Sequence, residues 1–516
     1  MTEALDLAWT ATETPPHLRL SALSPRVPPL EDLLTLGGDE RITIAGADGA
    51  NKYGCTPRPA PEVAAFGSST ASTISDTAFA AAERLRTRLS GFFDPAARIR
   101  AYRLELDRLR RELAALCGVQ RLRGLDILLA PSGTDLHLIA SELLETDRPL
   151  TCIGLEPAET GGGVGAALAG RHFSPRTALG DQVSPGDVIG DDGDGREVLA
   201  IRCREEDGAL RDEVHIEADL AAATAYAVGA GRRVLLVVTD VSKTGLLAPR
   251  PGAALRMRQR WPDSVEVLVD ACQFRLTPAS LRAYLEAGCM VAVTGSKFLT
   301  GPSFSGALFV PEVLAERLRR RGPSSRLQSY CARTDLPAHW AANSGLHDVD
   351  NCGMLVRWEA ALSELRAFRA VGDFSTATIL TAFARAVQAR LAEDPAFDPL
   401  PIRVPDRRAL IEGSGWDEIP TIFPFLLRTG KDRQTLLNRE QTEQVYRRLR
   451  AGGLQLGQPV ACGERDGAPV SALRLCASAR LVVEAYRGGP NGTDRVIARA
   501  MAALDKAAAK AARVKT

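Results

Sequence analysis

The feature that most constrains the fold is an alternation, between residues 125 and 296, of short apolar runs with segments of helical periodicity. The runs are apolar almost throughout rather than at every second residue, as in 232–240 (RRVLLVVTD) and 265–271 (VEVLVDA). Helical spacing follows them, as in 251–261 and 278–288. Strands of this kind are buried on both faces, and the helices between them act as crossovers. The sequence therefore predicts an α/β fold with a mostly parallel sheet flanked by helices.

The alternation fills only the middle of a 516-residue chain, which is too long for one compact domain. We expect an N-terminal arm with part of a small domain over residues 1–70, a large domain over 71–345, and a smaller α+β domain over 346–516. Two turn signals inside the large domain predict a hairpin insertion at about 181–216.

Composition argues against several classes of protein. The 64 Lys and Arg residues nearly balance 63 Asp and Glu, which speaks against a nucleic-acid binder. No apolar run is long enough to span a membrane, and residues 1–20 have no signal-peptide core. The ten cysteines contain no C-x-x-C, and the six histidines form no cluster. We therefore predict a cytoplasmic protein with buried thiols, no membrane or nucleic-acid partner and no metal.

The strand ends carry the residues of chemical interest, because ligands of open α/β sheets bind there. Ser132, Gly133 and Thr134 open a helix directly after the run 125–130. Backbone N–H groups and a hydroxyl at a helix N-terminus form a cradle suited to a phosphate. The same residues would also serve as an ordinary helix cap, so they do not decide the matter alone.

Lys297 and Asp270 follow two successive strands. Lys297 lies in a loop of Gly, Ser and Thr rather than on a solvated helix face. Asp270 ends an apolar strand, where a carboxylate is costly unless a cation or donors meet it. A pyridinium N–H would be such a partner, and a cap for the next turn is the plain alternative. Together with the phosphate turn, the pair is more specific than any one part.

These residues stand in motifs that resemble those of fold-type I pyridoxal-5′-phosphate enzymes, within the class V aminotransferase and cysteine desulfurase branch. The resemblance covers roughly residues 50–480, with gaps. The similar segments are VDACQ to V-D-A-x-Q, TGSKFLTGP to S-x-x-K-F-x-G-P, VTDVSKTGLLAP to N/S-x-T-G-x-x-x-P, TPRPAPEV to the N-terminal arm, and ALRLCAS to the R-x-S strand of the small domain.

The resemblance implies a fold-type I enzyme with pyridoxal 5′-phosphate as cofactor. Lys297 would form the Schiff base and shuttle a proton, Asp270 would pair with the pyridine nitrogen, and Gln273 would donate to the phenolic oxygen. Arg474 would bind a substrate carboxylate by a bidentate fork, although a surface arginine on an edge strand remains open. The residues implied around the cofactor phosphate are Ser132, Gly133, Thr134, Thr294 and Ser296.

Two positions depart from the family pattern. Where many family members have a histidine directly before the lysine, this chain has Ser296. The histidine that commonly stacks on the cofactor ring is absent near residues 154–163, so Glu159, Thr160 or His137 would take its place. For His137, a role as a core histidine is equally compatible with its position.

The family also implies a homodimer whose active site lies at the subunit interface. Tyr53 on the arm would then line the substrate pocket, or the arm would simply pack on the large domain.

The reaction remains open among the chemistries of this cofactor. Transamination of an amino acid or amine is the first interpretation. Elimination or desulfuration of a sulfur-bearing amino acid is the second. Cys462 lies twelve residues before Arg474 in a Gly-rich segment. It would be the nucleophile of a desulfuration, or simply a cysteine of a strand. A catalytically silent regulator is the remote third, against which the retention of Asp270, Gln273 and Lys297 argues.

Overall fold

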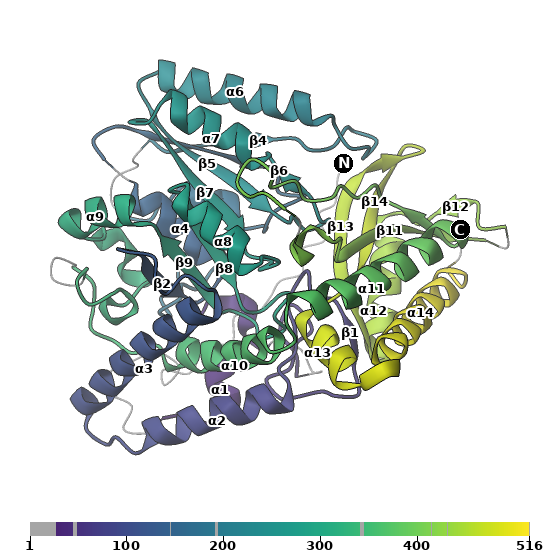
Figure 1. The fold of residues 1–516 in the computed structure, drawn as a ribbon, viewed down its shortest axis with the longest axis horizontal. Coiled ribbons are helices and arrows are strands. Elements are labelled where there is room, and N and C mark those ends of the chain that lie inside the picture. Colours follow the sequence, from purple (N-terminus) through teal and green to yellow (C-terminus); the bar gives the residue numbers. More distant parts are fainter. Residues whose placement is uncertain are drawn as a thin grey trace, which may run out of the picture.

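The computed structural model describes residues 27–44, 49–144, 146–190, 195–340, 345–413, 415–430 and 432–514. Within these ranges the chain forms two sheets with helices packed around each (Figure 1). Residues 1–26 of the expected N-terminal arm lie outside the described part.

An eight-stranded sheet forms the centre of the larger part. Its strands follow the order β2-β9-β8-β7-β5-β3-β4, with β6 paired to β5. The strands β8, β7, β5, β3 and β4 pair parallel, whereas β9 runs antiparallel to both of its neighbours. This arrangement confirms the mostly parallel sheet. The bounds are β2 Asp126–Ala130, β3 Leu150–Leu155, β4 Glu197–Ile201, β5 Arg233–Asp240, β6 Leu247–Ala248, β7 Val265–Ala271, β8 Met290–Thr294 and β9 Gly306–Val310.

Both faces of this sheet are covered, which explains why its strands are apolar throughout. Leu236 and Val238 of β5 belong to the core beneath α6, α7 and α8, whereas Leu235 and Val237 belong to the core beneath α4 and α5. Alternate side chains of a strand point to opposite faces, so both sets must be apolar. The bounds are α4 Gly133–Leu143, α5 Val164–Leu168, α6 Glu213–Gly229, α7 Pro251–Arg260, α8 Pro278–Glu286 and α9 Glu312–Arg321.

The segment 181–216, where we expected a hairpin insertion, contributes a strand to the main sheet. β4 pairs parallel with β3 at the sheet edge, and a bridge between Arg204 and Leu210 closes the turn that follows. The local turn signals were present, but the pairing partner of β4 lies some forty residues earlier in the chain.

A six-stranded sheet forms the smaller part, in the order β1-β13-β14-β11-β10 with β12 paired to β11. β1, from the N-terminal segment, pairs parallel with β13. The helices α11, α12 and α14 pack on this sheet, and α13 packs on α14 (Figure 1). The bounds are β1 Ala64–Phe66, β10 Phe397–Pro399, β11 Ile422–Thr429, β12 Thr435–Leu436, β13 Leu454–Arg465, β14 Ala468–Cys476, α11 Asp373–Glu393, α12 Arg439–Ala451, α13 Ala479–Arg487 and α14 Gly492–Ala511.

The helix α10 (Cys352–Arg369) joins the two parts and holds the N-terminal segment in place. It packs against α1 (Leu30–Thr35), α2 (Asp76–Ser90), α3 (Pro95–Leu116) and α13. Arg357 of α10 is fully buried and donates to the carbonyl oxygens of Leu33 (3.2 Å), Leu36 and Gly37 (2.7 Å). A buried guanidinium needs such acceptors, so this arginine fixes the path of the arm.

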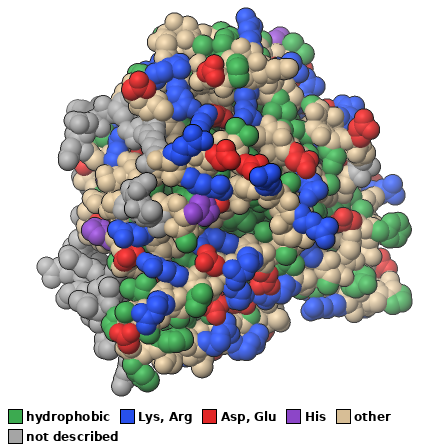
Figure 2. Space-filling view, turned by 60° about the vertical axis from the view of Figure 1, so that its left-hand side comes forward, with side chains coloured by type: hydrophobic (Ala, Val, Ile, Leu, Met, Phe, Trp, Pro, Cys, Tyr) green, Lys and Arg blue, Asp and Glu red, His purple; other side chains and the backbone are tan. Residues whose placement is uncertain are grey.

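The ten cysteines are all buried and none is in a disulfide, as predicted. Lys and Arg side chains are interspersed with Asp and Glu on the face in Figure 2, without one large field of a single sign. Within the described ranges, every helix is too short or too polar to pass through a bilayer.

Candidate active site

A cavity of about 510 Å³ lies at the carboxyl ends of β2, β5, β7 and β8, where the large sheet faces β13 and β14 of the smaller one. Most residues singled out in the sequence line it. They are Tyr53, Ser132, Gly133, Thr134, His137, Glu159, Thr160, Asp270, Gln273, Thr294, Ser296, Lys297 and Arg474.

Asp270 and His137 form a buried pair at the centre of the cavity. His137 Nε2 lies 3.3 Å from Asp270 Oδ2, and its Nδ1 lies 2.7 Å from the carbonyl oxygen of Gly133. The backbone N–H of Cys272 donates to Asp270 Oδ1 (3.1 Å). Burial alone would raise the pKa of Asp270, but His137 and Lys297 hold that pKa well below its usual range. The carboxylate is therefore ionised at neutral pH.

Asp270 acts on His137 in return. Burial would lower the pKa of the imidazole, but the adjacent carboxylate raises it above its ordinary value. His137 is thus a buried histidine with a charge partner, one turn into α4. The sequence offered His137 as a ring-stacking residue or a core histidine, and its contact with Asp270 was not foreseen.

Lys297 stands just beyond β8 and is half-buried. Among the described residues, no hydrogen bond or ion pair engages its amine, whereas its backbone carbonyl accepts from Thr300 N (3.0 Å) and Ser72 Oγ (3.5 Å). The backbone is therefore anchored while the side chain reaches into the cavity. An amine held in this way is suited to attack a carbonyl carbon.

The turn before α4 divides its polar groups between capping and the cavity. Ser132 Oγ donates to Asp135 Oδ2 (2.5 Å) and accepts from Asp135 N (3.2 Å), so it closes a capping box. Thr134 Oγ1 instead accepts from Arg41 Nη1 (3.1 Å), which leaves its own proton to donate. Thr134 and Arg41, together with the helix N-terminus, are the groups best placed to hold an anion.

Arg41 comes from the N-terminal arm and was not foreseen. It forms an ion pair with buried Asp39 (2.6 Å), and its guanidinium lies over the rings of Phe304 (4.9 Å) and Phe173 (5.8 Å). Burial would lower the pKa of Arg41, but Asp39 raises it above the ordinary value. A permanent cation therefore stands at the phosphate turn.

The remaining residues predicted to contact the cofactor differ in whether their polar atoms already have hydrogen-bond partners in the protein. Gln273 Nε2 donates to Ser69 O (3.0 Å), and its Oε1 has no partner within the described part of the chain. Thr294 Oγ1 donates to Cys272 O (2.6 Å), which commits its proton. Ser296 is buried at the cavity wall. Gly133 has no room for a Cβ, because it would come within 2.8 Å of Cys272 Sγ.

Arg474 enters from β14 and is fully buried rather than on the surface. Its guanidinium donates to Lys243 O (3.2 Å), Thr70 Oγ1 (3.1 Å) and Gln458 O (2.5 Å), and no carboxylate among the described residues pairs with it. Burial lowers its pKa from the ordinary value. A buried guanidinium without a counter-ion favours an anionic ligand.

Lys243 is, after Arg41, the second cation of the cavity that the sequence did not identify as a site residue. It follows β5, lines the cavity, and donates through Nζ to Pro157 O (3.1 Å). Burial, Arg474 and Lys297 together lower the pKa of its ammonium to about 8. Two residues before it, Val241 has a φ of 65°, which is strained for a β-branched side chain.

Glu159 and Thr160 occupy the region where a ring-stacking residue was expected. The carboxylate of Glu159 is buried and bound by Arg204 Nε (2.8 Å), Ser242 Oγ (2.6 Å) and Thr244 Oγ1 (2.7 Å). It is therefore a neutralised support for the loop after β5. Thr160 is buried at the cavity wall and donates to Glu156 O (3.4 Å).

Cys462 does not line the cavity. It lies on β13 rather than in a mobile loop, packed with Leu426 and Val470, and its Sγ donates to Val470 O (3.7 Å). Burial raises the pKa of the thiol to about 11. Cys331 is also buried, and burial raises its pKa well above the usual range. Neither thiol has the thiolate character or access of a nucleophile.

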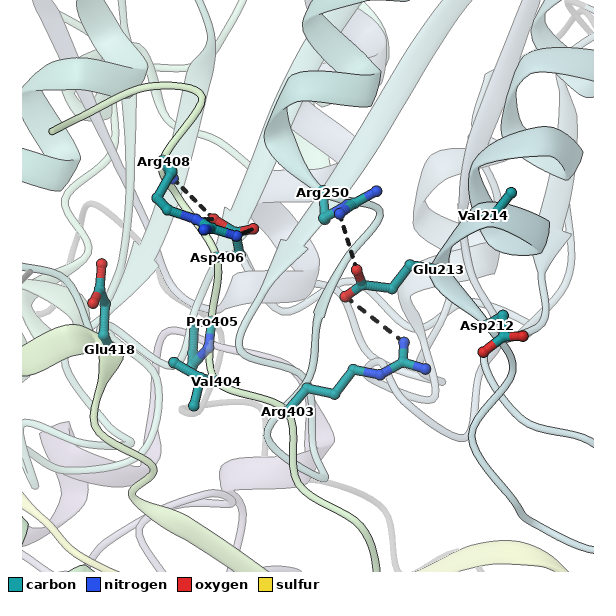
Figure 3. A pocket seen from close by; sticks show the side chains of 10 residues that line it. All are labelled: Asp212, Glu213, Val214, Arg250, Arg403, Val404, Pro405, Asp406, Arg408 and Glu418. Carbon is teal, nitrogen blue, oxygen red and sulfur yellow. Dashed lines mark hydrogen bonds and ion pairs between the residues drawn. The ribbon is translucent and has the colours of Figure 1, made fainter.

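A second hollow, of about 560 Å³, lies between the start of α6 and the segment 403–408 (Figure 3). Its side chains are mostly charged, but they pair with each other. Arg250 contacts Glu213 (3.1 Å), Arg403 contacts Glu213 (3.8 Å), and Arg408 contacts Asp406 (2.7 Å). The described residues that line this surface cleft include no nucleophile and no unpaired buried charge, so we assign the chemistry to the first cavity.

No protein-family model and no curated protein sequence matches the chain. Several solved structures share its fold. A complex of the cystine C-S lyase C-DES with its product cysteine persulfide is 15% identical, with a TM-score of 0.52, over 85% of this chain and 97% of that one. Mouse CSAD is 15% identical, with a TM-score of 0.50, over 87% of this chain and 84% of that one. A lysine-to-alanine variant of C-DES, with glycine linked covalently to its PLP cofactor, is 14% identical, with a TM-score of 0.50, over 85% of this chain and 96% of that one. The chain therefore has the fold of the fold-type I pyridoxal-phosphate-dependent enzymes.

Proposed function

We propose that the protein is a pyridoxal-5′-phosphate-dependent enzyme acting on an amino acid or amine, with transamination as the first candidate reaction. The observation that carries this proposal is the placement of Lys297 beside the buried Asp270–His137 pair in one cavity. A lysine and an ionised aspartate at successive strand ends are the groups that an imine-forming pyridine cofactor requires.

The residues present fit such a cofactor. Asp270 would hold the ring nitrogen, Gln273 would face the phenolic oxygen, and Lys297 would hold the aldehyde carbon. Thr134, Arg41 and the N-terminus of α4 would take the phosphate. On this same wall, Gln273 Oε1 is a buried polar atom without a hydrogen-bond partner among the described residues.

The cofactor, when bound, supplies an electron sink for the α-carbon of the substrate. Asp270 then keeps a proton on the ring nitrogen, because His137 stabilises the carboxylate in its ionised form. Lys297 moves the proton at the α-carbon, and Arg474 orients the substrate by its carboxylate. Thr134 and Asp270 are themselves buried in the cavity wall, which keeps both groups in a fixed position.

Elimination at sulfur is the second candidate, and the likeness to the C-S lyase C-DES supports it. Such an elimination needs the lysine but no enzyme thiol. The burial of Cys462 argues against desulfuration through a persulfide on this residue. A catalytically silent regulator is the least supported alternative, since the cavity retains Lys297 together with the Asp270–His137 pair.

Reconstitution with pyridoxal phosphate tests the proposal. The wild-type protein should gain a near-visible absorbance band that Lys297→Ala lacks, and borohydride should fix the cofactor on Lys297, as read by peptide mass. Lys506→Ala, an exposed lysine on α14, is the matched control and should behave as wild type. A wild-type protein that takes up no cofactor, or a Lys297→Ala variant that keeps the band, would overturn it.

The reaction class follows from the products. A keto acid formed from an amino acid at the expense of a second keto acid supports transamination. Release of sulfide or a persulfide from cysteine or cystine, unchanged in Cys462→Ser, supports elimination. Sulfur release that requires Cys462 would instead support desulfuration.

We also propose a homodimer, as the resemblance to the fold-type I family implies. Sedimentation equilibrium checks it directly: the protein should have twice the mass of the 55.2 kDa chain.

A further inference from the structure

The cavity carries more positive charge than its own carboxylates neutralise. Its charged side chains, apart from His137, are Arg41, Lys52, Lys243, Lys297, Arg474, Glu159 and Asp270. Both carboxylates already have partners, because Glu159 binds Arg204 and Asp270 binds His137. Arg41 is paired with Asp39. Within the described part of the chain, no carboxylate forms an ion pair with Lys243, Lys297 or Arg474.

The proposed function accounts for one of these cations, since Lys297 would carry the cofactor. Of the other cations, Arg41 is paired and Lys52 is exposed, so Arg474 and Lys243 remain for the substrate. Arg474 is fully buried, its Nε has no partner among the described residues, and burial disfavours its charge. A single α-carboxylate would satisfy only this guanidinium.

Lys243 lies beside Arg474 and is left with a neutral acceptor. The carbonyl oxygen of Lys243 accepts from Arg474 Nη1 at 3.2 Å, so the two residues are in direct contact. Within the described part of the chain, the Lys243 ammonium has one hydrogen-bond partner, the carbonyl oxygen of Pro157 at 3.1 Å. Burial and the charge of Arg474 lower the pKa of the Lys243 ammonium, so its charge is unfavourable in this half-buried site unless an anion joins it.

We propose that the substrate is an amino acid whose side chain ends in an anionic group, with its α-carboxylate on Arg474 and its side-chain acid on Lys243. This inference rests on the proposed function for the fate of the amino group and adds the class of substrate. The terminal acid is a carboxylate or a sulfur oxyacid, since both present oxygen acceptors to an ammonium.

Lys243 occupies a position well suited to selecting the substrate. It lies between Ser242 and Thr244, whose hydroxyls are both bound to Glu159. The backbone N–H of Lys243 also donates to Glu159 O (2.9 Å). The backbone around it is thus fixed by Glu159, whereas its side chain is held by one hydrogen bond to a neutral carbonyl oxygen, which an anionic ligand could replace.

Calorimetric titration of the cofactor-loaded protein tests the inference with acids that lack an amino group. Glutarate and succinate should bind about tenfold to a hundredfold more tightly than butyrate, the range expected for one hydrogen-bonded charge. Lys243→Met should abolish the difference, Lys243→Arg should preserve most of it, and Lys506→Met should leave it unchanged. Analogues of the same length in which a sulfonate replaces one of the two carboxylates distinguish a sulfur oxyacid from a carboxylate as the preferred group.

A second titration follows the cofactor absorbance with L-aspartate and L-glutamate against L-asparagine and L-glutamine. The acids should be preferred by the wild type, and the preference should disappear in Lys243→Met. Equal binding of acids and amides to the wild type, or a preference that survives in Lys243→Met, would overturn the inference. Thermal melts of both Lys243 variants separate this result from misfolding.

The two proposals fail in different ways. A protein that takes up no pyridoxal phosphate but binds glutarate through Lys243 would remove the proposed function and keep the anion site. A protein that takes up the cofactor on Lys297 without any preference for diacids would keep the function and remove the anion site.

Discussion

The two hollows of this molecule are similar in volume, about 510 and 560 Å³, and both are lined with charged side chains. In the surface cleft of Figure 3, arginines and carboxylates neutralise each other within the cleft. In the cavity at the strand ends, Lys297, Lys243 and Arg474 have no counter-ion among the described residues. The difference teaches that unpaired buried charge, rather than the size of a hollow, marks a site.

Backbone strain separates the two regions as well. Of the described non-glycine residues with positive φ, Val241, Phe274, Thr300 and Phe304 all stand in loops around the cavity. Their φ values lie between 55° and 72°. Strain of this kind persists where the surrounding structure fixes it, and it concentrates at functional sites.

The largest expected effect is on the buried pair. His137→Phe should lower the free energy of unfolding by about 3–5 kcal/mol, because it leaves Asp270 buried without its partner. His137 has a raised pKa, so its contribution is complete below about pH 6.5 and is lost as pH rises through the folded-state pKa. Asp270 has a lowered pKa, so its contribution is lost only as pH falls below about 4.

Chemical denaturation of wild type and His137→Phe between pH 4 and pH 9 measures this effect. The difference between them should be largest near pH 5–6 and should shrink toward alkaline pH. His137→Gln, which keeps a donor for Asp270, should lose less. A difference that grows with rising pH would contradict the pairing.

Arg474→Lys should raise KM for an amino acid by about tenfold to a hundredfold, because a lysine keeps the charge but not the fork that meets a carboxylate. Steady-state kinetics with an amino acid and with the matching amine lacking the carboxylate measures this loss. The variant should hardly change KM for the amine. An equal loss for both substrates would show that Arg474 is only a structural contact.

Gly457→Ala should act on the same arginine indirectly. A Cβ at this position would come within 2.7 Å of Ser69 Oγ and 2.9 Å of Arg474 Nε. We expect a cost of about 1–2 kcal/mol in unfolding free energy and a modest rise in KM. Gly229→Ala, where a Cβ meets open space at the end of α6, is the control. A Gly457→Ala protein with unchanged KM would mean that Arg474 has room to move.

Arg250→Ala, in the cleft of Figure 3, should have the smallest effect. Its ion pairs with Glu213 and Glu217 are partly exposed, so their loss should cost about 0–1 kcal/mol. Cofactor uptake and kinetics should not change. A loss of activity comparable to that of Arg474→Lys would abolish the distinction between the two hollows.

The sequence carried enough information to predict the sheet and the strand-end residues. Lys297, Asp270 and Thr134 follow apolar strands directly, and parallel strands bring such ends to one edge. Their common cavity is therefore a consequence of local pattern and topology.

Other residues could not be located in this way, because their role depends on contacts between distant segments. Arg41 reaches Thr134 across 93 residues, and no local pattern links them. The pairing of β4 with β3 also joins distant segments, so the local sequence of β4 does not indicate its partner. Cys462 shows the converse: its Gly-rich surroundings indicate a loop, but pairing of β13 with β14 makes it a strand.

The buried arginine of α10 has a consequence for how the protein is made. Arg357 binds the carbonyls of the arm, and the arm delivers Arg41 to the cavity, whereas Arg474 arrives from β14. During synthesis, the wall of the cavity stays open until the ribosome has released β14. A nascent chain therefore lacks the Arg474 guanidinium in this cavity until β14 has left the ribosome, so capture of a ligand that needs both Arg41 and Arg474 would report on completion of this part of the fold.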